Sequence, residues 1–393
     1  MRKLIIYSSI QLYDAHHGGS ELRVLGYTAH LERYLKDFCY CGPDKPVDIL
    51  DEHYHHFILS AKWKKLMLLC NVIYQYLHIP LYCCRWLINR FSGIRDLIGL
   101  VADGELLLIH QDCTVAEYLR IVEHTKYVYD IHGFFDIQRE YFTLHYGFQR
   151  FIMYLYLWQE RVALASCDFI NVESLEMKEY VYHRFHPKGK ILLAPDGIPA
   201  DVVDYQTQKP IIAKRPYILF AGSYKPMGGV LDLMETYIHS ARLQEIADLL
   251  VIGDGPELAM AKVKEFQSYV PEHIVLLPPM EHLKLIAYMK GATAIVCPDR
   301  EDNVYNQVCP HIKLYDALAT GNPIVATDLS VNRHIVPINY PIRYFGKQMT
   351  MECALIDAMN LAVWTGQEEL MKLTYSYRLE KYWQQNRKIL LNY

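Results

Sequence analysis

Short apolar runs alternate with longer stretches of helical periodicity along the whole chain. A short apolar run bounded by polar or turn residues is typical of a buried strand. We predict such strands at Leu4–Ser8, Glu105–Ile109, Tyr127–Ile131 and Phe169–Val172 and, in a second series, at Tyr217–Phe220, Leu249–Ile252, Ile274–Leu277, Ala294–Cys297 and Pro323–Thr327. Strands that alternate with helices form parallel sheets covered on both faces, so the pattern predicts an α/β fold with two doubly wound, Rossmann-like halves.

Between the strands, apolar residues recur at the spacing of amphipathic helices. Such stretches include Glu21–Tyr34, Phe134–Ala165 and the terminal segment Gly366–Leu391. Ser174 is a good N-cap for the helix that follows it. A further helix is predicted from His311 to Ala319, after Pro310, with Gly321 ending it.

The polar, proline-containing stretch Asp201–Arg215 lies between the two series and has the character of a domain linker. A chain of 393 residues is also longer than one ordinary core requires. We therefore predict a first domain over 1–200, a second over 201–365 and a separate terminal helix over 366–393. A cleft at the carboxyl ends of the strands is the expected place for chemistry.

Composition excludes several classes of function. The chain is 52% apolar with a formal net charge of −4, whereas a nucleic-acid-binding protein normally has a basic surplus. Its 10 cysteines form no Cys-x-x-Cys pair, which favours buried thiols in a reducing compartment over a zinc or disulfide framework. The apolar run after Met1 is too short for a signal peptide, so we expect a cytoplasmic protein.

One segment leaves a membrane question open. Over 63–91, apolar residues recur at helical spacing, a polar stripe accompanies them, and basic residues stand at both ends. Pro80 interrupts the run, which argues against a spanning helix. The segment is either a core-facing helix or an amphipathic helix that lies on the inner face of an anionic membrane.

Candidate ligand contacts in the first half lie at predicted strand ends. Gly18 and Gly19 precede a helix, where glycine backbone lets an anionic group approach free N–H groups. The alternative is a plain turn between a strand and a helix. His132 follows the predicted strand Tyr127–Ile131 and can hydrogen-bond a sugar hydroxyl or a developing charge, although a lone histidine is more often structural.

The second half repeats this arrangement. After the strand Tyr217–Phe220 come Gly222, Ser223 and Lys225, which have the character of a phosphate-binding turn. Gly253 follows the next strand in a tight turn. Each of these turns, taken alone, is equally consistent with simple connection chemistry.

The stretch 298–328 carries the most information. A polar loop containing Glu301 and Asn306 leads into the helix from His311, on which Lys313 and Asp316 share one face. A carboxylate there can accept both hydroxyls of a ribose, and a lysine can neutralise a phosphate. The alternative is an exposed i, i+3 ion pair between these two residues, worth a few tenths of a kcal/mol.

The order of these segments resembles the family 4 retaining glycosyltransferases with the GT-B fold. The matching stretches are Gly18-Gly19-Ser20-Glu21, Asp130-Ile131-His132-Gly133, Ala194-Pro195-Asp196-Gly197-Ile198, Gly222, Gly253-Asp254-Gly255-Pro256 and Lys313 to Pro323. The resemblance implies an enzyme that transfers a sugar, with retention and without a metal or other cofactor, from a nucleotide-diphosphate donor to a glycan or lipid-linked acceptor. It also implies that the terminal helix crosses back to the first domain.

The resemblance implies roles for individual residues. Asp316 matches the acidic position that binds the donor ribose, Gly18 and Gly19 match the loop near the diphosphate, and His132 matches the histidine that contacts the donor sugar. Lys313 and His132 are the expected catalytic residues. The other expected donor contacts are Gly222, Ser223, Lys225, Gly253, Glu301 and Asn306.

Three positions depart from the family pattern. Val308 stands where the family often has a second carboxylate, which Glu301 or Asp302 would have to supply. Ser223 and Gly228 stand where an arginine and a lysine are common. These departures keep open a non-catalytic GT-B protein that binds nucleotide sugar. An epimerase-type enzyme or an inverting transferase of the same fold is a further alternative.

Overall fold

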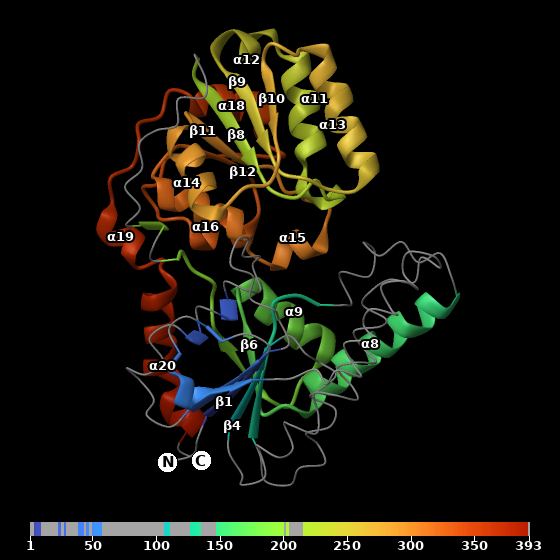
Figure 1. Cartoon of the computed structure of the whole chain (residues 1–393), viewed down its shortest axis with the longest axis vertical. Helices are drawn as coiled ribbons and strands as arrows, with labels where there is room; N and C mark the ends of the chain where they lie inside the picture. The colour runs from blue at the N-terminus through green and yellow to red at the C-terminus, as the bar shows by residue number, and fades with distance from the viewer. Residues whose placement is uncertain are drawn as a thin grey trace. The chain divides into compact units, whose positions relative to one another are not determined.

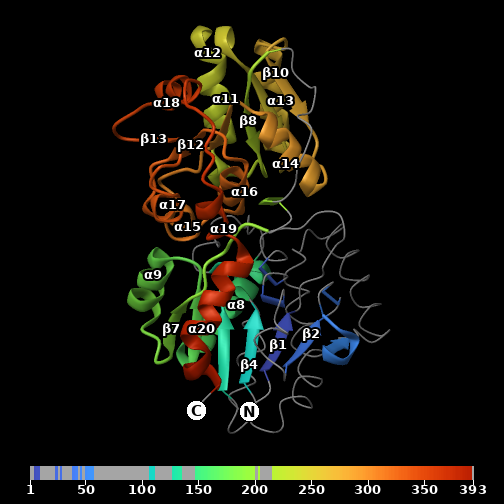
Figure 2. The same ribbon diagram turned by 90° about the vertical axis from the view of Figure 1, so that its left-hand side faces the viewer.

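The computed structural model describes residues 4–8, 23–24, 27–28, 38–42, 45–46, 49–56, 106–110, 126–134, 147–199, 202–203 and 215–391. The chain divides into two compact units (Figures 1 and 2). Unit 1 comprises Met1–Tyr13, His17–Pro195 and Leu379–Tyr393, and unit 2 comprises Asp14–His16 and Asp196–Arg378. The units thus divide after Pro195 and Arg378, whereas the sequence places the domain boundaries after residues 200 and 365.

Unit 1 is built on a 7-stranded sheet in the order β3-β2-β1-β4-β5-β6-β7. All pairings between these strands are parallel. The strands are β1 (Leu4–Ser8), β2 (Phe38–Gly42), β3 (Tyr54–His56), β4 (Leu106–His110), β5 (Lys126–Asp130), β6 (Phe169–Val172) and β7 (Lys190–Leu193), with a short 3-10 turn η1 (Asp51–His53) before β3. The order reverses between β1 and β4, as in a doubly wound sheet.

In the part of unit 1 that the structure describes, the long helices are α8 (Gly147–Ser166), α9 (Leu175–Phe185) and α20 (Tyr375–Leu391), the last of them shared with unit 2. The Ser174 hydroxyl accepts a hydrogen bond from Met177 N–H at 2.9 Å, which confirms the predicted N-cap of α9. Within α20 the chain passes from unit 2 to unit 1. Figure 2 shows the later turns of α20 against the first sheet, where the Tyr382 hydroxyl donates to Asn171 Oδ1 of β6 at 2.9 Å.

Unit 2 is built on a 6-stranded sheet in the order β10-β9-β8-β11-β12-β13, again parallel throughout. Its strands are β8 (Tyr217–Ala221), β9 (Asp248–Ile252), β10 (Ile274–Leu277), β11 (Ala294–Cys297), β12 (Ile324–Thr327) and β13 (Ile342–Phe345). The order reverses between β8 and β11, so the second sheet has the same doubly wound construction as the first.

Helices cover both faces of the second sheet. They are α11 (Val230–His239), α12 (Ala241–Ile246), α13 (Glu257–Tyr269), α14 (His282–Gly291), α15 (Val304–Val308), α16 (Ile312–Thr320), α17 (Ser330–Ile335), α18 (Met351–Ala358) and α19 (Gln367–Met371), with the 3-10 turn η4 (Pro226–Gly228) before α11. Figure 1 shows α11 and α13 on one side of the strands and α14 and α16 on the other.

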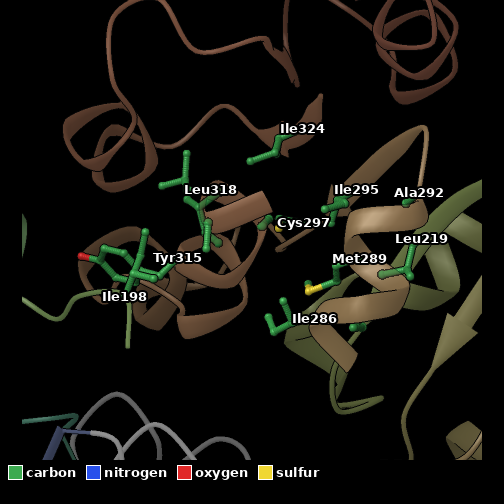
Figure 3. Packing of buried hydrophobic residues seen from close by; sticks show 14 of the residues in the cluster. Ile198, Leu219, Ile286, Met289, Ala292, Ile295, Cys297, Tyr315, Leu318 and Ile324 are labelled. Atoms are coloured by element: carbon green, nitrogen blue, oxygen red, sulfur yellow. The ribbon is translucent and has the colours of Figure 1, made fainter. Parts of the chain in front are cut away.

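The core of unit 2 has two layers because strand side chains alternate between the faces. Leu219 and Cys297 point into the layer that α14 and α16 fill, whereas Ile218 and Val296 point into the layer that α11, α13 and α18 fill. Figure 3 shows the first layer, with Ile286 and Met289 from α14, Tyr315 and Leu318 from α16 and Ile295, Cys297 and Ile324 from the strands. This apolar layer packs α14 and α16 against each other.

The predicted α/β construction is confirmed, with differences in detail. The first predicted series lacked β2, β3 and β7, and the second lacked β13. The long helix expected over Phe134–Ala165 is wrong at its start, since Phe134 is not helical and α8 is described from Gly147. The helix expected over Gly366–Leu391 is two helices, α19 and α20, with a break between Met371 and Tyr375.

None of the helices that the structure describes combines the length and the apolar character needed to cross a bilayer. The segment 63–91 lies outside the described residues, so its predicted membrane contact stays a prediction.

Candidate functional site

The carboxyl ends of β8 and β11 adjoin where the strand order of the second sheet reverses. The loops that follow such neighbouring strands lead to opposite faces of the sheet, and α/β proteins bind ligands in the crevice between them. The two loops here are residues 222–229 after β8 and 298–303 after β11. They hold Gly222, Ser223, Lys225 and Glu301 of the predicted donor contacts.

The loop after β8 is packed against the loop after β9. Gly222 N–H donates to the Ile252 carbonyl at 3.0 Å, and Tyr224 N–H donates to the Asp254 carbonyl at 2.6 Å. Gly253 has a φ of 149°, and a Cβ on it would lie 2.0 Å from the Gly222 carbonyl oxygen. Glycine is therefore required at this crossing, and the structure brings Gly222 and Gly253 together.

The beginning of α11 touches the loop after β11. Gly229 is the N-cap of α11 with a φ of 62°, and a Cβ there would lie 1.6 Å from the Pro298 carbonyl oxygen. Glycine alone fits so close a contact in the left-handed region. Ser223 and Lys225, which precede this contact, have exposed side chains, so both are accessible to a ligand.

Asn306 on α15 holds the loop after β11 in place. Its side chain is buried, and Nδ2 donates to the carbonyl oxygens of Met227 and Arg300 at 2.9 Å each. Its Oδ1 lies 3.0 Å from His311 Nε2. These contacts connect the loop after β8, the loop after β11 and the start of α16. The buried Asn306 side chain therefore holds these loops in position.

The two acidic residues that could replace the carboxylate missing at Val308 lie on the surface of the loop. Asp302 pairs with Arg300 at 2.9 Å, and this hydrogen bond holds the pKa of the Asp302 carboxyl below its usual value. Glu301 has an exposed side chain, and its carbonyl oxygen accepts from Gln307 Nε2 at 2.8 Å. Val308 itself is buried.

Lys313 lies in the first turn of α16, close to the end of β11. Its ammonium donates to Asp299 Oδ1, and Nζ lies 5.8 Å from the centre of the Phe220 ring. The Lys313 side chain is 17% exposed and the Asp299 side chain 2%. The exposed i, i+3 pair of Lys313 with Asp316 that the helix spacing allowed is therefore not formed, because Asp299 holds the cation instead.

The start of α16 adds a second source of positive potential. His311 is its N-cap residue, and the His311 side chain makes no capping hydrogen bond because it is directed to Asn306. The first N–H groups of a helix carry partial positive charge and bind anions when no side chain caps them. The ammonium of Lys313 and this helix end thus reinforce each other.

Asp316 lies one turn further along α16 and is nearly buried. Its side chain is 7% exposed, and Oδ2 lies 3.1 Å from Nε2 of His282, the first residue of α14. Among the described residues, no hydrogen-bond partner reaches Asp316 Oδ1. A buried carboxylate oxygen without a donor is unfavourable by about 1–3 kcal/mol, so this oxygen is suited to accept hydroxyl groups of a ligand.

In unit 1, His132 follows β5 and is held by a buried carboxylate. Its Nδ1 contacts Glu173 Oε1, with the His132 side chain 14% exposed and the Glu173 side chain 1%. Arg23 Nη1 lies 3.8 Å from the same Glu173 oxygen. When Nδ1 donates to a carboxylate, the neutral ring presents its lone pair at Nε2, so this contact selects the tautomer as well as the orientation.

The strand end before His132 is fixed by a buried ion pair. Arg23 donates to both carboxylate oxygens of Asp130, from Nε at 2.9 Å and from Nη2 at 2.7 Å. The Tyr27 hydroxyl donates to the same carboxylate at 2.7 Å, and burial raises the pKa of Tyr27 well above its ordinary value, so it remains a neutral donor. This network makes the backbone that carries His132 rigid.

Two expected features of the site lie outside the described residues. They are Gly18 and Gly19, predicted near the diphosphate, and the segment 63–91, predicted to contact a membrane. Their roles stay predictions.

Three residues that contact the predicted site residues were not found from the sequence. They are Asp299, His282 and Glu173. Asp299 and Glu173 each come directly or nearly directly after a strand, at the edge where doubly wound sheets bind ligands, so strand-end position could have indicated them. Nothing in the local sequence connects His282 with Asp316.

The buried thiol of Cys297 stays protonated beside the site. Cys297 lies at the end of β11, and burial raises its pKa to about 12, so it remains a thiol at neutral pH.

Residues 215–339 match the family model "Glycosyl transferases group 1". No curated protein matches the chain. Solved structures resemble it over nearly the whole length. A sucrose-phosphate synthase from Thermosynechococcus elongatus is 15% identical, with a TM-score of 0.69 and 100% of both chains covered.

Two further structures extend the comparison. An α,α-trehalose-phosphate synthase (UDP-forming) from Burkholderia vietnamiensis is 11% identical, with a TM-score of 0.66 and 98% of both chains covered. Anabaena HepE, solved in complex with UDP and glucose, is 12% identical, with a TM-score of 0.58, 98% of this chain and 95% of that chain covered. The predicted GT-B fold is confirmed by these solved structures, and residues 215–339 of the second unit resemble the glycosyl transferases of group 1.

Proposed function

We propose that this protein transfers a sugar from a nucleoside diphosphate donor, a UDP-sugar foremost, to a glycan or lipid-linked acceptor with retention at the anomeric carbon. One observation carries the proposal: Lys313 and Asp316 lie about one turn apart on α16. This helix follows β11, where the strand order of the second sheet reverses, and it lies within the matched family region. Two of the similar structures concern UDP, one as a UDP-forming enzyme and one as a complex with UDP and glucose.

The proposed binding mode follows α16. The diphosphate lies near the first turn, where Lys313 and the uncapped helix start supply positive charge, and the ribose hydroxyls donate to Asp316. Gly222, Ser223, Lys225 and Gly253 lie in the loops after β8 and β9, at the carboxyl ends of these strands. Asn306 acts through the loop it holds.

Catalysis in this proposal is mainly electrostatic. As the bond from the sugar to the diphosphate breaks, negative charge grows on the leaving phosphate, and a cation already held in place stabilises it without rearranging. Asp299 provides that placement for Lys313. We expect the leaving phosphate to help deprotonate the acceptor hydroxyl, and we expect no metal or other cofactor to take part.

His132 is the proposed catalytic contact from unit 1. The family resemblance gives it the donor sugar as partner, and the contact with Glu173 fits that role because it orients the imidazole and sets its tautomer. Glu301 is the proposed replacement for the carboxylate missing at Val308, since its side chain is exposed on the loop after β11.

A binding protein without transferase activity, or an epimerase-type enzyme, is the competing function. The observation that favours it is the buried, apolar Val308 at a position where the family often has a carboxylate. Both competing functions use the same nucleotide site. In the binding protein the sugar stays on the nucleotide, and in the epimerase its configuration changes without transfer to an acceptor.

The test has two stages. Nucleoside diphosphate sugars with uracil, guanine or adenine bases are screened by thermal shift, because a ligand specific for the folded protein raises its unfolding temperature. The stabilising donor is then incubated with the protein and candidate glycan and lipid-linked acceptors, and NMR follows the anomeric proton. Transfer with retention supports the proposal. Stabilisation with no transfer and no hydrolysis supports the binding protein, an epimerised sugar supports the epimerase, and no stabilisation by any donor rejects the nucleotide site.

The acceptor class and the place of action are also proposals. We expect a cytoplasmic enzyme that contacts the inner face of a membrane through 63–91 when its acceptor is lipid-linked. Flotation with anionic liposomes of the intact protein and of a variant with the basic residues flanking this segment neutralised tests that expectation.

A further inference from the structure

The contact between His282 and Asp316 is the strongest feature of unit 2 that the proposed function does not use. His282 Nε2 lies 3.1 Å from Asp316 Oδ2, and the two side chains are 18% and 7% exposed. They come from different helices, α14 and α16, so the contact is not a consequence of local sequence.

The packing of α14 against α16 makes this contact rigid. His282 lies one helical turn before Ile286, and Ile286 is buried in the same core layer as Tyr315, the neighbour of Asp316. Figure 3 shows Ile286 of α14 and Tyr315 of α16 in this layer. Because protein cores resist deformation, the imidazole is held at a fixed place beside the carboxylate.

The two oxygens of Asp316 have different surroundings. His282 lies against Oδ2, whereas no hydrogen-bond partner among the described residues reaches Oδ1, which is buried. Rotation about the last bond of the side chain changes the plane of the carboxylate. A neighbour at a fixed place beside one oxygen favours one plane, so the other oxygen stays directed to a ligand donor.

We propose that His282 is a positioning residue that turns Asp316 so that Oδ1 accepts the hydroxyl groups of the donor ribose. The pair thereby determines the specificity for ribonucleotides over deoxyribonucleotides. The proposal rests on the proposed function, since it presumes the ribose at Asp316.

The experiment compares ribonucleotides with their deoxy analogues. Affinities of the full-length protein for UDP, GDP and ADP, and for the 2′,3′-dideoxy form of each, are measured by calorimetry. We expect the ribonucleotide with the highest affinity to bind at least about tenfold more tightly than its dideoxy form, because the dideoxy form lacks the hydrogen bonds to a charged group. In His282→Ala the ratio of the two affinities, ribonucleotide over dideoxy form, should fall to about threefold or less. The same low ratio is expected for Asp316→Asn.

Two variants separate positioning from stability. In His282→Gln the amide nitrogen reaches the place of Nε2, so the ratio should recover at least in part. His239→Ala removes an exposed histidine at the end of α11 and should leave the ratio unchanged. Unfolding temperatures of all variants show whether a loss of affinity is a loss of fold.

The outcomes distinguish the role of His282 from the ribose assignment of Asp316. An unchanged ratio in His282→Ala, together with a reduced ratio in Asp316→Asn, overturns the role of His282 and leaves the ribose site intact. An unchanged ratio in Asp316→Asn overturns the ribose assignment in the proposed function. Absence of binding by all three ribonucleotides rejects the nucleotide site and both proposals with it.

Discussion

Lys313 donates a hydrogen bond to Asp299, a residue that is 2% exposed at the end of β11. The pair joins the start of α16 to the reversal point of the second sheet. An ammonium held by a buried carboxylate has already lost most of its conformational freedom. A phosphate that arrives there meets a fixed cation, which is the arrangement that electrostatic catalysis requires.

The first prediction concerns this cation. Lys313→Ala should weaken binding of the nucleoside diphosphate by about 10- to 100-fold, since a hydrogen bond to a charged group contributes about 1.5–3 kcal/mol. Binding of the nucleoside without phosphates should not change. Calorimetry with both ligands measures the difference, with Lys264→Ala on the exposed face of α13 as control. Equal losses for nucleoside and diphosphate would show that Lys313 does not contact the phosphates.

The second prediction compares two adjacent glycines. Gly229→Ala should destabilise unit 2 by more than about 1–2 kcal/mol, because its φ of 62° is unfavourable for alanine and its Cβ would meet the Pro298 carbonyl oxygen. Gly228→Ala places its Cβ 3.2 Å from the Ser223 carbonyl oxygen and should have a smaller effect. Urea unfolding of both variants measures the two free energies, and equal values would contradict this account of the loop.

The prediction of the fold from sequence succeeded for most strands inside the two sheets, although it missed the buried strand β2. The strands Leu4–Ser8, Phe169–Val172, Ile274–Leu277 and Ala294–Cys297 have the predicted bounds. Three of the strands that were not predicted, β3, β7 and β13, lie at sheet edges. Edge strands pair on one side only and tolerate polar and charged residues, as in Lys190–Leu193 and Ile342–Phe345, so the apolar pattern that marks a strand is weak there.

For the candidate site, the sequence predicts the residues on α16 but not the residues that contact them. Lys313 and Asp316 stand in a motif whose spacing is local, and the helix around them forms as predicted. Their partners, Asp299 and His282, come from other elements, and the contacts depend on how those elements pack. A local pattern allowed Lys313 and Asp316 to pair with each other, and tertiary packing gave each a different partner.

The third prediction concerns the buried ion pair of unit 1. Arg23→Leu leaves the Asp130 carboxylate buried without its cation and should lower the free energy of unfolding by about 3–5 kcal/mol. Arg333→Ala, which breaks an exposed arginine–aspartate pair with Asp328, should cost less than about 1 kcal/mol. Chemical denaturation followed by circular dichroism gives both values. A small effect of Arg23→Leu would mean that the Asp130 network does not hold this strand end.

The fourth prediction concerns the tautomer of His132. In the neutral imidazole the proton should reside on Nδ1, because Nδ1 contacts the Glu173 carboxylate. Nitrogen-15 NMR of histidine-labelled protein, assigned with a His132→Ala variant, reports which nitrogen is protonated. Glu173→Leu should abolish this preference and reduce sugar transfer by about 10- to 100-fold, as misplacement of a catalytic group does.

A second variant of Glu173 separates geometry from charge. Glu173→Gln retains an acceptor oxygen and should keep the Nδ1 proton and most of the activity. A His132 ring protonated on Nε2 in the unaltered protein, or full activity in Glu173→Leu, would contradict the positioning role of Glu173.

The most direct test of the central claim is a calorimetric titration of UDP into the unaltered protein, Asp316→Ala and Asp357→Ala. Asp357 is an exposed aspartate of α18 and serves as the matched control. A nucleotide-sugar site on α16 predicts saturable binding to the unaltered protein and the control, and binding weaker by about tenfold or more in Asp316→Ala. Equal UDP affinity in all three proteins would contradict the claim that Asp316 holds the donor ribose.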